Sequence, residues 1–427
     1  MKHIFLVLIT LIQVLCGNAA QQKCVTVSIT NPAKGLRSSG EIVEISMSEL
    51  SKRLGTSECS LIVTDQEGNE VPSQMTYDGK LIFQIGAITP KGTHIYNVRE
   101  GAPASYVSKV YGRQYKERQE DFSFENDRIG YRLYGPETQN KKKERLYGYD
   151  IFNKRTEELI LDELYADQTD SRMWATFDRL NKKGRKHLAD SLYMAFCYHI
   201  DHGKGMDCYK VGPTLGAGTN ALLNPQDGSI VYPWCYASYE ILDNGPLRLT
   251  VKFDYGNRKL EGKDIHETRI LTIDAGSNMV KADVIYEGLP HDKNIDACAG
   301  IVVHDENPDG YRLNKEKRYM AYEDLGDVNV AWPGFRETQA KEMGSIFIGT
   351  VFPCQISKCE FRESDISGAK GHVMTILPCP KSGRFTYYFG SGWNRNPVTN
   401  INSLDDWEKY LSDFSANLNN PLKVNLK

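Results

Sequence analysis

Several signatures of common enzyme classes are missing from this chain. It contains no GxxxxGK[ST] phosphate loop, no GxSxG nucleophile elbow and no HExxH zinc motif. This excludes the sequence motifs by which nucleotide hydrolases, serine hydrolases and zinc peptidases are usually recognised. No N-x-[ST] glycosylation site occurs, which favours bacterial export over a eukaryotic secretory route. No repeat of fixed period and no low-complexity tract is visible.

An excess of basic charge is also missing. The chain has 52 Lys and Arg against 55 Asp and Glu, a formal net charge of -3. The basic run KKKER at 141–145 is short and is typical of a solvated loop rather than of a nucleic-acid face. Nucleic acid is therefore not an expected partner.

Long apolar runs are absent except at the beginning of the chain. Lys2 and His3 precede the apolar run IFLVLITLIQVL, and GNAA supplies small residues for cleavage, so residues 1–20 are expected to be an export signal peptide. The run is too short to span a bilayer. Leu15 precedes Cys16, where a lipoprotein signal has a small residue. We therefore expect a periplasmic or secreted protein, with lipid attachment as the less favoured outcome.

Cysteine is not dense enough to indicate a disulfide scaffold. Of ten cysteines, nine would remain after cleavage, and an odd number leaves at least one thiol unpaired. Cys354 and Cys359 could close a hairpin, but the sequence does not fix the pairing.

Short runs of alternating apolar and polar residues, bounded by turn residues, fill most of the chain. They predict an all-β protein: a small N-terminal β-sandwich over 21–105, a connector over 106–120, and a large antiparallel supersandwich over 121–427. Only two helices are expected. They are RKHLADSLYMAF at 185–196 and the amphipathic LDDWEKYLSDFSANL at 404–418, which has acidic residues in its first turn.

The stretch HIDHGKGMDCYKVGPTLGAG at 199–218 concentrates chemically active residue types. His199 and His202, with Asp201 or Asp207, could bind a divalent ion such as zinc. Alternatively, the stretch supplies acids and bases to a sugar-binding cleft, or it is a loop rich in hydrogen bonds. Its glycines lack the βαβ context of a dinucleotide site, and would instead let the backbone approach a ligand closely.

The stretch DENPDGYRLNKE at 305–316 has the residue spacing of a calcium-binding loop. A strand precedes it, however, no helix pair frames it, and Pro308-Asp309-Gly310 also forms an ordinary β-turn. Calcium therefore stays open as an alternative, and the expected chemistry requires no cofactor.

Three further side chains are candidates because of their neighbours. Trp234 and Trp393 stand beside Pro or Gly, where loops expose aromatic rings that can stack on sugars. Packing in the sandwich core is the alternative for both. His304 follows the apolar run GIVV, so it projects into a cleft or forms part of the sandwich rim.

Several motifs together resemble one functionally uncharacterised family of exported Bacteroidetes proteins. They are ENDRIGYRLYGPE, LYGYDIFNKRTEELILDELY, YHIDHGKGMDCYKVGPTLGAG, EILDNGPLRLTVKFDY, HETRILTIDAGSNMVKADV, GIVVH and YYFGSGWNR, and the resemblance covers roughly residues 30–427. The family tends to accompany enzymes that degrade plant and algal polysaccharides. It is similar to the galactose-mutarotase-like supersandwich proteins, which include aldose epimerases and domains of polysaccharide lyases.

This resemblance implies chemistry on a sugar ring. Mutarotases open and close a pyranose with a His acid and a Glu base, and His304 occupies a position like that of their His. No carboxylate matches the Glu expected late in the chain, which argues against simple mutarotase chemistry.

We therefore expect an exported carbohydrate-active enzyme acting on uronic-acid oligosaccharides, most concretely a lyase. β-Elimination needs a cation on the carboxylate, a base for the C5 proton and an acid for the leaving oxygen. The candidate catalytic residues are His199, Tyr209, His202, Asp207 and His304. The candidate substrate-binding residues are Arg132, Lys204, Trp234 and Trp393.

In this hypothesis Arg132 holds the carboxylate, His199 is the base and Tyr209 is the acid. His202 or Asp207 orients the base, and His304 is the alternative base. An epimerase or a hydrolase acting in the same cleft is a second reading. A non-catalytic glycan-binding protein, which needs aromatic platforms but no titratable pair, is a third.

Overall fold

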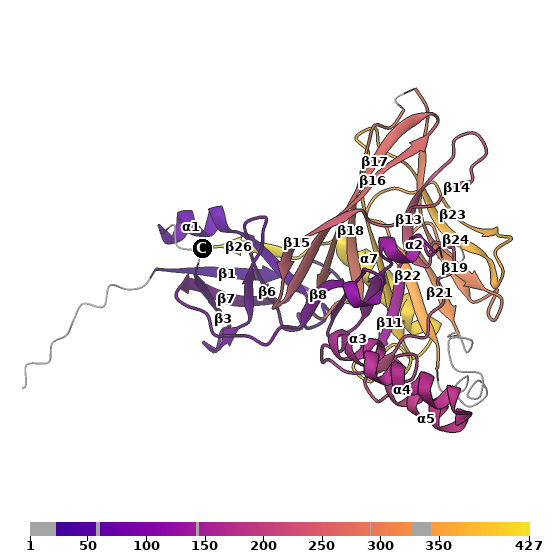
Figure 1. Cartoon of the computed structure of the whole chain (residues 1–427). Helices are drawn as coiled ribbons and strands as arrows, with labels where there is room; N and C mark the ends of the chain where they lie inside the picture. Colours follow the sequence, from indigo (N-terminus) through magenta and orange to yellow (C-terminus); the bar gives the residue numbers. More distant parts are fainter. Residues whose placement is uncertain (1–22, 57–59, 142–144, 291, 326–342) are drawn as a thin grey trace, which may run out of the picture.

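The computed structural model describes residues 23–56, 60–141, 145–290, 292–325 and 343–427 (Figure 1). Within these residues most of the regular structure is β-strand, arranged in antiparallel sheets. The prediction of an all-β fold is confirmed. The expected export signal at 1–20 lies outside the described residues.

A small sandwich forms the first part of the fold. One sheet has the order β26-β1-β7-β3-β4 and the other β2-β6-β5. Inward positions alternate along β1, where Val25, Val27 and Ile29 are buried, because successive side chains of a strand point to opposite faces. The elements are β1 (Cys24–Thr30), β2 (Ile42–Ser46), α1 (Met47–Leu54), β3 (Leu61–Thr64), β4 (Glu70–Val71), β5 (Ser73–Met75), β6 (Lys80–Gln84) and β7 (Thr93–Glu100).

The last strand of the chain completes this sandwich. β26 (Lys423–Leu426) pairs with β1, placing Val27 opposite Leu426. Figure 1 shows the chain returning beside β1 at its C-terminal end. The sandwich is therefore built from both ends of the chain rather than from one continuous segment.

A second five-stranded sheet, with the order β12-β11-β10-β9-β8, begins inside the stretch expected to be a connector. Its first strand, β8, starts at Val110, and a short 3₁₀ turn, η1, follows it. The elements are β8 (Val110–Tyr115), η1 (Lys116–Arg118), β9 (Asp121–Asn126), β10 (Gly130–Leu133), β11 (Asp150–Lys154) and β12 (Gly205–Met206).

Two further sheets form the rest, one of five strands and one of eight. The first has the order β14-β13-β19-β24-β23, and the second the order β15-β16-β17-β18-β25-β22-β21-β20. Nearly every residue of β19 is buried, as expected for a central strand covered on both faces. The strands are β13 (Ala217–Leu223), β14 (Ile230–Val231), β15 (Ser238–Asn244), β16 (Arg248–Leu260), β17 (Lys263–Asp274), β18 (Met279–Glu287), β19 (Asp296–His304), β20 (Tyr311–Asn314), β21 (Tyr319–Asp324), β22 (Ile346–Val351), β23 (Lys358–Glu363), β24 (Ala369–Pro378) and β25 (Arg384–Trp393).

Side chains of these three sheets share one hydrophobic core. Tyr131 of β10 packs edge-on against Phe389 of β25, with ring centroids 5.1 Å apart. Val373 of β24 and Ile301 of β19 belong to the same core. The sheet that carries Arg132 is thereby held against the sheet that carries His304 and the sheet that carries Asp324.

Two of the longer helices lie where the sequence predicts them. α5 (Lys186–Phe196) and α7 (Leu404–Asn419) match the two expected segments, and Ser403 caps α7 by accepting a hydrogen bond from the Asp406 N–H. Three further helices among the described residues beyond the sandwich were not expected: α2 (Pro136–Gln139), α3 (Leu161–Thr169) and α4 (Ser171–Lys182). No helix in the described part of the chain is long and apolar enough to cross a membrane.

A buried carboxylate starts α3. Both the Ile160 and Leu161 N–H groups donate to Glu125 Oε1, at 2.8 and 2.7 Å. The other oxygen of Glu125 pairs with Lys154 Nζ at 2.5 Å, and both side chains are at most 1% exposed. This helix start depends on a residue that is distant in sequence, so local patterning does not reveal it.

The Glu125–Lys154 pair gives a stability prediction. Lys154→Met leaves the buried Glu125 charge uncompensated, which costs about 3–5 kcal/mol when one partner of a buried pair is removed. Urea unfolding followed by circular dichroism measures the loss. Lys409→Met, which breaks the exposed pair with Asp413, is the control and is expected to change little. Equal losses in both variants would contradict the prediction.

Candidate functional site

His304 stands at the end of β19 and is tied to a carboxylate on another strand. Its Nδ1 lies 2.7 Å from Asp324 Oδ1, at the end of β21, and its backbone N–H donates to Tyr322 Oη at 3.0 Å. The imidazole side chain is only 7% exposed. Because Asp324 engages Nδ1, it fixes the ring and leaves Nε2 for another partner, as in other His–carboxylate pairs.

The pKa of His304 follows from two opposing causes. Burial disfavours the imidazolium, but the charge of Asp324 and its hydrogen bond together outweigh burial. The pKa is therefore raised above its ordinary value of 6.5. Glu306 raises it slightly further, whereas Lys210 lowers it.

A second histidine, His372, lies on the neighbouring strand β24. β24 pairs with β19 so that His372 stands opposite Val302, two positions before His304. The Leu215 N–H donates to His372 Nε2 at 3.2 Å. Burial, and then the nearby His304, lower the pKa of His372 to about 4, which keeps this imidazole neutral.

Tyr209 brings a buried hydroxyl to His304. The two ring centroids are 5.8 Å apart, and Tyr209 is 3% exposed. Its Oη has no hydrogen-bond partner among the described residues. Buried polar groups are nearly always paired, so an unpartnered buried hydroxyl is unusual. Burial also raises the pKa of Tyr209, so it remains protonated at neutral pH.

Arg132 is not available as a clamp for a substrate carboxylate. Its guanidinium is buried and bonded to two carboxylates of the protein: Nε lies 2.9 Å from Asp150 Oδ2, and Nη2 lies 2.8 Å from Asp207 Oδ2. The hydroxyls of Tyr134 and Tyr198 accept from the remaining donors. The expected role of Arg132 in substrate binding is therefore corrected: it is an internal counter-ion.

The histidines of the 199–218 stretch have separate partners. His199 Nδ1 lies 2.8 Å from the Asp207 carbonyl oxygen, and burial lowers its pKa to about 4. His202 is exposed, with Nε2 3.2 Å from the Cys197 carbonyl oxygen. Asp201 pairs with Arg155 instead. Across the described ranges no group of three His, Cys, Asp or Glu side chains is arranged to hold a metal ion.

Lys204 lies on the outer side of this stretch. Its Nζ forms exposed ion pairs with Glu158 and Glu163, at 3.1 and 2.8 Å. The stretch is therefore divided: Tyr209 faces His304, Asp207 and His199 join Arg132, and Lys204 faces α3. The sequence suggests one site, whereas the structure places these residues in three environments.

The calcium-like stretch does not form one loop. β20 (Tyr311–Asn314) interrupts it, so Glu316 lies in the turn after that strand. The Asn307 side-chain amide donates to the Glu323 carbonyl oxygen at 2.8 Å, and the Gly310 N–H donates to the Asn307 carbonyl oxygen. This is the turn chemistry that Pro308-Asp309-Gly310 suggested, and the oxygen ligands of a calcium loop do not converge.

The glycines at 216 and 218 serve packing within the chain. Gly216 has a φ of +55°, and a Cβ there would stand 2.4 Å from the Tyr149 carbonyl oxygen. A Cβ on Gly218 would stand 2.8 Å from Phe389 Cβ. The close backbone approach expected for a ligand is therefore made to neighbouring strands.

The two tryptophan candidates differ sharply in exposure. Trp393 is 2% exposed, and its Nε1 donates to the Met343 carbonyl oxygen at 2.6 Å, so it is a core residue and offers no face to a sugar. Trp234 is 42% exposed. Only Trp234 can serve as the stacking surface expected from the sequence.

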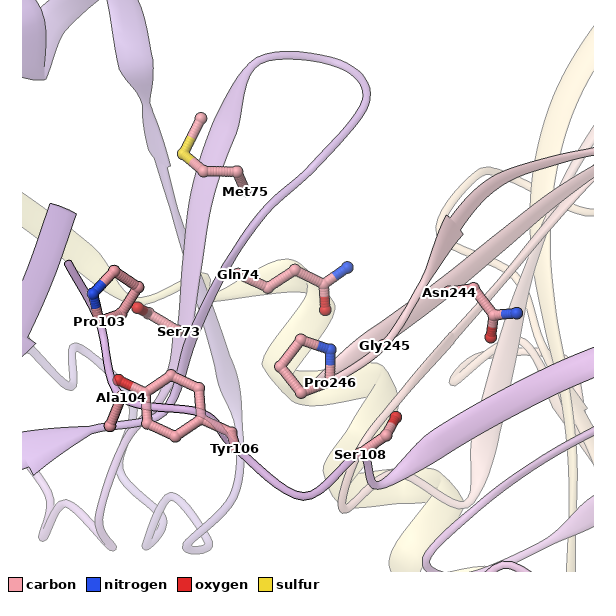
Figure 2. Close-up of a pocket in the computed structure, with 10 residues that line it drawn as sticks. All are labelled: Ser73, Gln74, Met75, Pro103, Ala104, Tyr106, Ser108, Asn244, Gly245 and Pro246. Carbon is pink, nitrogen blue, oxygen red and sulfur yellow. The ribbon is translucent and has the colours of Figure 1, made fainter. Parts of the chain in front are cut away.

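Figure 2 shows a separate pocket of about 460 Å³ where the first sandwich meets the loop Asn244–Pro246. Gln74 points into it, but its amide already accepts from Leu247 and Arg248 and donates to the Arg248 carbonyl oxygen. Tyr106 on its other side bonds Glu70. None of the candidate site residues lines this pocket.

Sequence analysis missed three residues around His304: Asp324, Tyr322 and His372. The carboxylate partner was sought late in the chain, whereas it lies 20 positions after His304. The segment YMAYED carries a signal in retrospect, because alternation puts Tyr322 and Asp324 on one face of a buried strand. His372 opens the apolar run HVMTIL, and only strand pairing shows that it lies close to His304.

The His304–Asp324 contact gives a prediction on charge. In Asp324→Asn the carboxylate that raises the pKa of His304 is gone while burial remains, so the pKa should fall below 6.5. NMR titration of the histidine ring protons measures it. Glu306→Gln, on the exposed neighbour, is the control and should give a smaller decrease. An unchanged pKa in Asp324→Asn would contradict the assignment.

The same pair has a consequence for stability. Because the folded state raises the pKa of His304, the pair stabilises the fold fully below about pH 6.5, and this contribution is lost as pH rises through the raised pKa.

Comparison with known proteins identifies relatives across almost the whole chain. The Uncharacterized protein P7 of Formosa agariphila is 23% identical over 445 residues and is matched over 100% of both chains. Two solved structures from Enterococcus faecalis are similar at TM-scores below 0.5. One is a protein in glycosyl hydrolase family 38 (TM-score 0.46, 9% identity) and the other an alpha-mannosidase (0.47, 8%).

Each structural match covers 95% of this chain but 47% and 46% of the other, so the chain spans about half the length of those proteins. Because the TM-scores are below 0.5, these matches carry no argument about the activity of this chain. The predicted links to polysaccharide breakdown and to galactose-mutarotase-like proteins stay predictions. The expectation of an uncharacterised family is confirmed: residues 29–424 match one family model, and the chain belongs to the family described as Domain of unknown function (DUF4861).

Proposed function

We propose that this protein is an exported, periplasmic or secreted carbohydrate-active enzyme. It acts on uronic-acid-containing oligosaccharides by acid–base chemistry at His304, most concretely as a lyase. The observation that carries the proposal is the His304–Asp324 pair beside the unpartnered hydroxyl of Tyr209. The chemistry requires no cofactor.

His304 and Tyr209 divide the two proton transfers of β-elimination. Neutral His304 removes the C5 proton through Nε2, the C–H electrons form the C4–C5 double bond, and the C4–O bond breaks. The Tyr209 hydroxyl, which burial keeps protonated, protonates the leaving oxygen. Asp324 stabilises the imidazolium that forms, as the carboxylate of a triad does.

A cation near the base is the third requirement. Lys210 follows Tyr209 directly and is close enough to influence the pKa of His304. It replaces Arg132 as the group that offsets the negative charge growing on the substrate carboxylate after C5 deprotonation. His304 rather than His199 is the base in this scheme, because the His304 ring contacts Tyr209, whereas the His199 ring contacts Tyr198 and the Asp207 carbonyl oxygen.

A non-catalytic glycan-binding protein is the second candidate. The exposed Trp234, 6.4 Å from Tyr147 between ring centroids, favours it, because aromatic faces bind sugars without any proton transfer. An epimerase or a hydrolase would use the same His304 and Tyr209 and would differ only in product.

Proton NMR of galacturonate, mannuronate and glucuronate oligosaccharides mixed with the protein tests the proposal. A vinyl proton signal should appear with the wild type. His304→Gln and Tyr209→Phe should each slow its appearance by about 10²–10⁴-fold, the usual contribution of a positioned acid or base.

His199→Gln is the matched control and should keep most of the rate. New anomeric signals without a vinyl proton, or faster anomeric exchange alone, would replace the lyase by a hydrolase or an epimerase. Binding without turnover would favour the glycan-binding alternative. A His304→Gln variant with full rate would contradict the assignment of the base.

A further inference from the structure

Three aromatic side chains form a continuous surface feature beside the His304 site. Tyr147 lies 5.4 Å from Tyr232 and 6.4 Å from Trp234 between ring centroids. Tyr147 and Tyr232 are half-buried and Trp234 is exposed. We refer to Tyr147, Tyr232 and Trp234 as the aromatic rim.

The exposure of Trp234 calls for an explanation. Of the four tryptophans within the described ranges, it is the only one in the exposed class. A core role accounts for Trp393 and Trp407, which are at most 2% exposed, but not for Trp234. Exposed aromatic side chains that adjoin polar groups are typical of recognition surfaces.

The rim leads to the proposed site. The Tyr232 ring lies 6.1 Å from the His372 ring, and His372 is close enough to His304 for the charge of His304 to lower the pKa of His372. The order from solvent inward is therefore Trp234, Tyr147, Tyr232, His372 and His304. An extended ligand with one unit at His304 can place its following units along the rim.

A cation lies on the outer end of the rim. The Arg145 guanidinium carbon is 4.9 Å from the centre of the Trp234 ring, a cation–π arrangement. Arg145 is exposed, and no ion pair of it occurs among the described residues. The planar guanidinium can form two parallel hydrogen bonds to a carboxylate or a sulfate, while the aromatic ring supports its other face.

We infer that the aromatic rim and Arg145 form a second binding subsite for a sugar unit that carries an oxyanion substituent, a carboxylate or a sulfate ester. This inference rests on the proposed function, and it specifies the substrate as an acidic oligosaccharide rather than a monosaccharide. The aromatic faces pack on the C–H face of the sugar, and Arg145 selects the anionic group. Neither the aromatic rim nor Arg145 takes part in proton transfer.

Binding measurements on the full chain test the inference. Isothermal titration compares galacturonate, mannuronate and glucuronate as monosaccharides and tetrasaccharides, with a sulfated galactan tetrasaccharide and a neutral galactan tetrasaccharide. The inactive His304→Gln variant serves as background, so that turnover does not consume the ligand. Trp234→Ala and Arg145→Gln are introduced into this background.

The matched controls remove the same kinds of side chain elsewhere. Tyr77→Ala removes an aromatic ring that is 53% exposed on the first sandwich, and Arg172→Gln removes an exposed arginine at the start of α4. Among the described residues neither side chain contacts the rim, and both variants should bind every ligand as the background does.

The expected result is tighter binding of an acidic tetrasaccharide than of its monosaccharide, and about tenfold weaker tetrasaccharide binding in each rim variant. Monosaccharide binding should be unchanged. If Arg145→Gln weakens binding of the sulfated tetrasaccharide more than binding of the uronate tetrasaccharides, the oxyanion is a sulfate ester. The reverse result identifies a carboxylate. Unchanged tetrasaccharide binding in both rim variants, equal binding of the neutral tetrasaccharide, or no binding of any acidic tetrasaccharide would overturn the inference.

Failure of the inference and failure of the proposed function are distinguishable. If the rim variants bind normally while His304→Gln abolishes turnover, the subsite is wrong and the catalytic assignment stands. If the rim variants lose tetrasaccharide binding while the wild type forms no product, the subsite stands and the enzyme assignment is wrong.

Discussion

The ion pairs of Arg132 with Asp150 and Asp207 are the constraint on which the site depends. Removing three charges from water is costly, and it is offset here because each partner is also hydrogen bonded. Asp207 is tied to Arg132 through its side chain, and to Tyr198 through its backbone N–H, at 2.9 Å. Tyr209, two residues on, is thereby held against His304.

The buried charges around Arg132 sum to zero only when one of the neighbouring carboxylates is protonated. Arg118 and Arg132 face three carboxylates: Asp150, Asp207 and Asp121. Burial raises the pKa of Asp121 to about 7 although both arginines lower it. The five groups carry no net charge when Asp121 is protonated and one negative charge when it is ionised. The charge of the core beneath the site therefore changes by one unit near pH 7.

Local pattern was sufficient for most of the fold. The segments MVKADVIYE and LDDWEKYLSDFSANL correspond to β18 and to most of α7, because alternation and amphipathic spacing depend only on neighbouring residues. α3 was missed because a distant carboxylate, Glu125, supplies its N-terminal hydrogen bonds. β26 was missed because pairing between the two chain ends leaves no local signal.

For the site, residue types were predicted better than their partners. His304, Tyr209 and Trp234 have roles in the proposed function, whereas the side chains of Arg132 and Trp393 are buried and bonded within the protein. A sequence shows that an arginine is present, but it does not show that two carboxylates from other strands already occupy it. The same reason hid Asp324, which meets His304 only because β21 of one sheet packs near β19 of another.

The measurement that tests the account most directly is a crystal structure of the His304→Gln variant with an acidic tetrasaccharide. We expect one uronate ring between residue 304 and the Tyr209 hydroxyl, with its carboxylate toward Lys210 and the following units along Tyr232 and Trp234. A tetrasaccharide bound instead in the pocket near Gln74, or on another surface remote from position 304, would contradict the account.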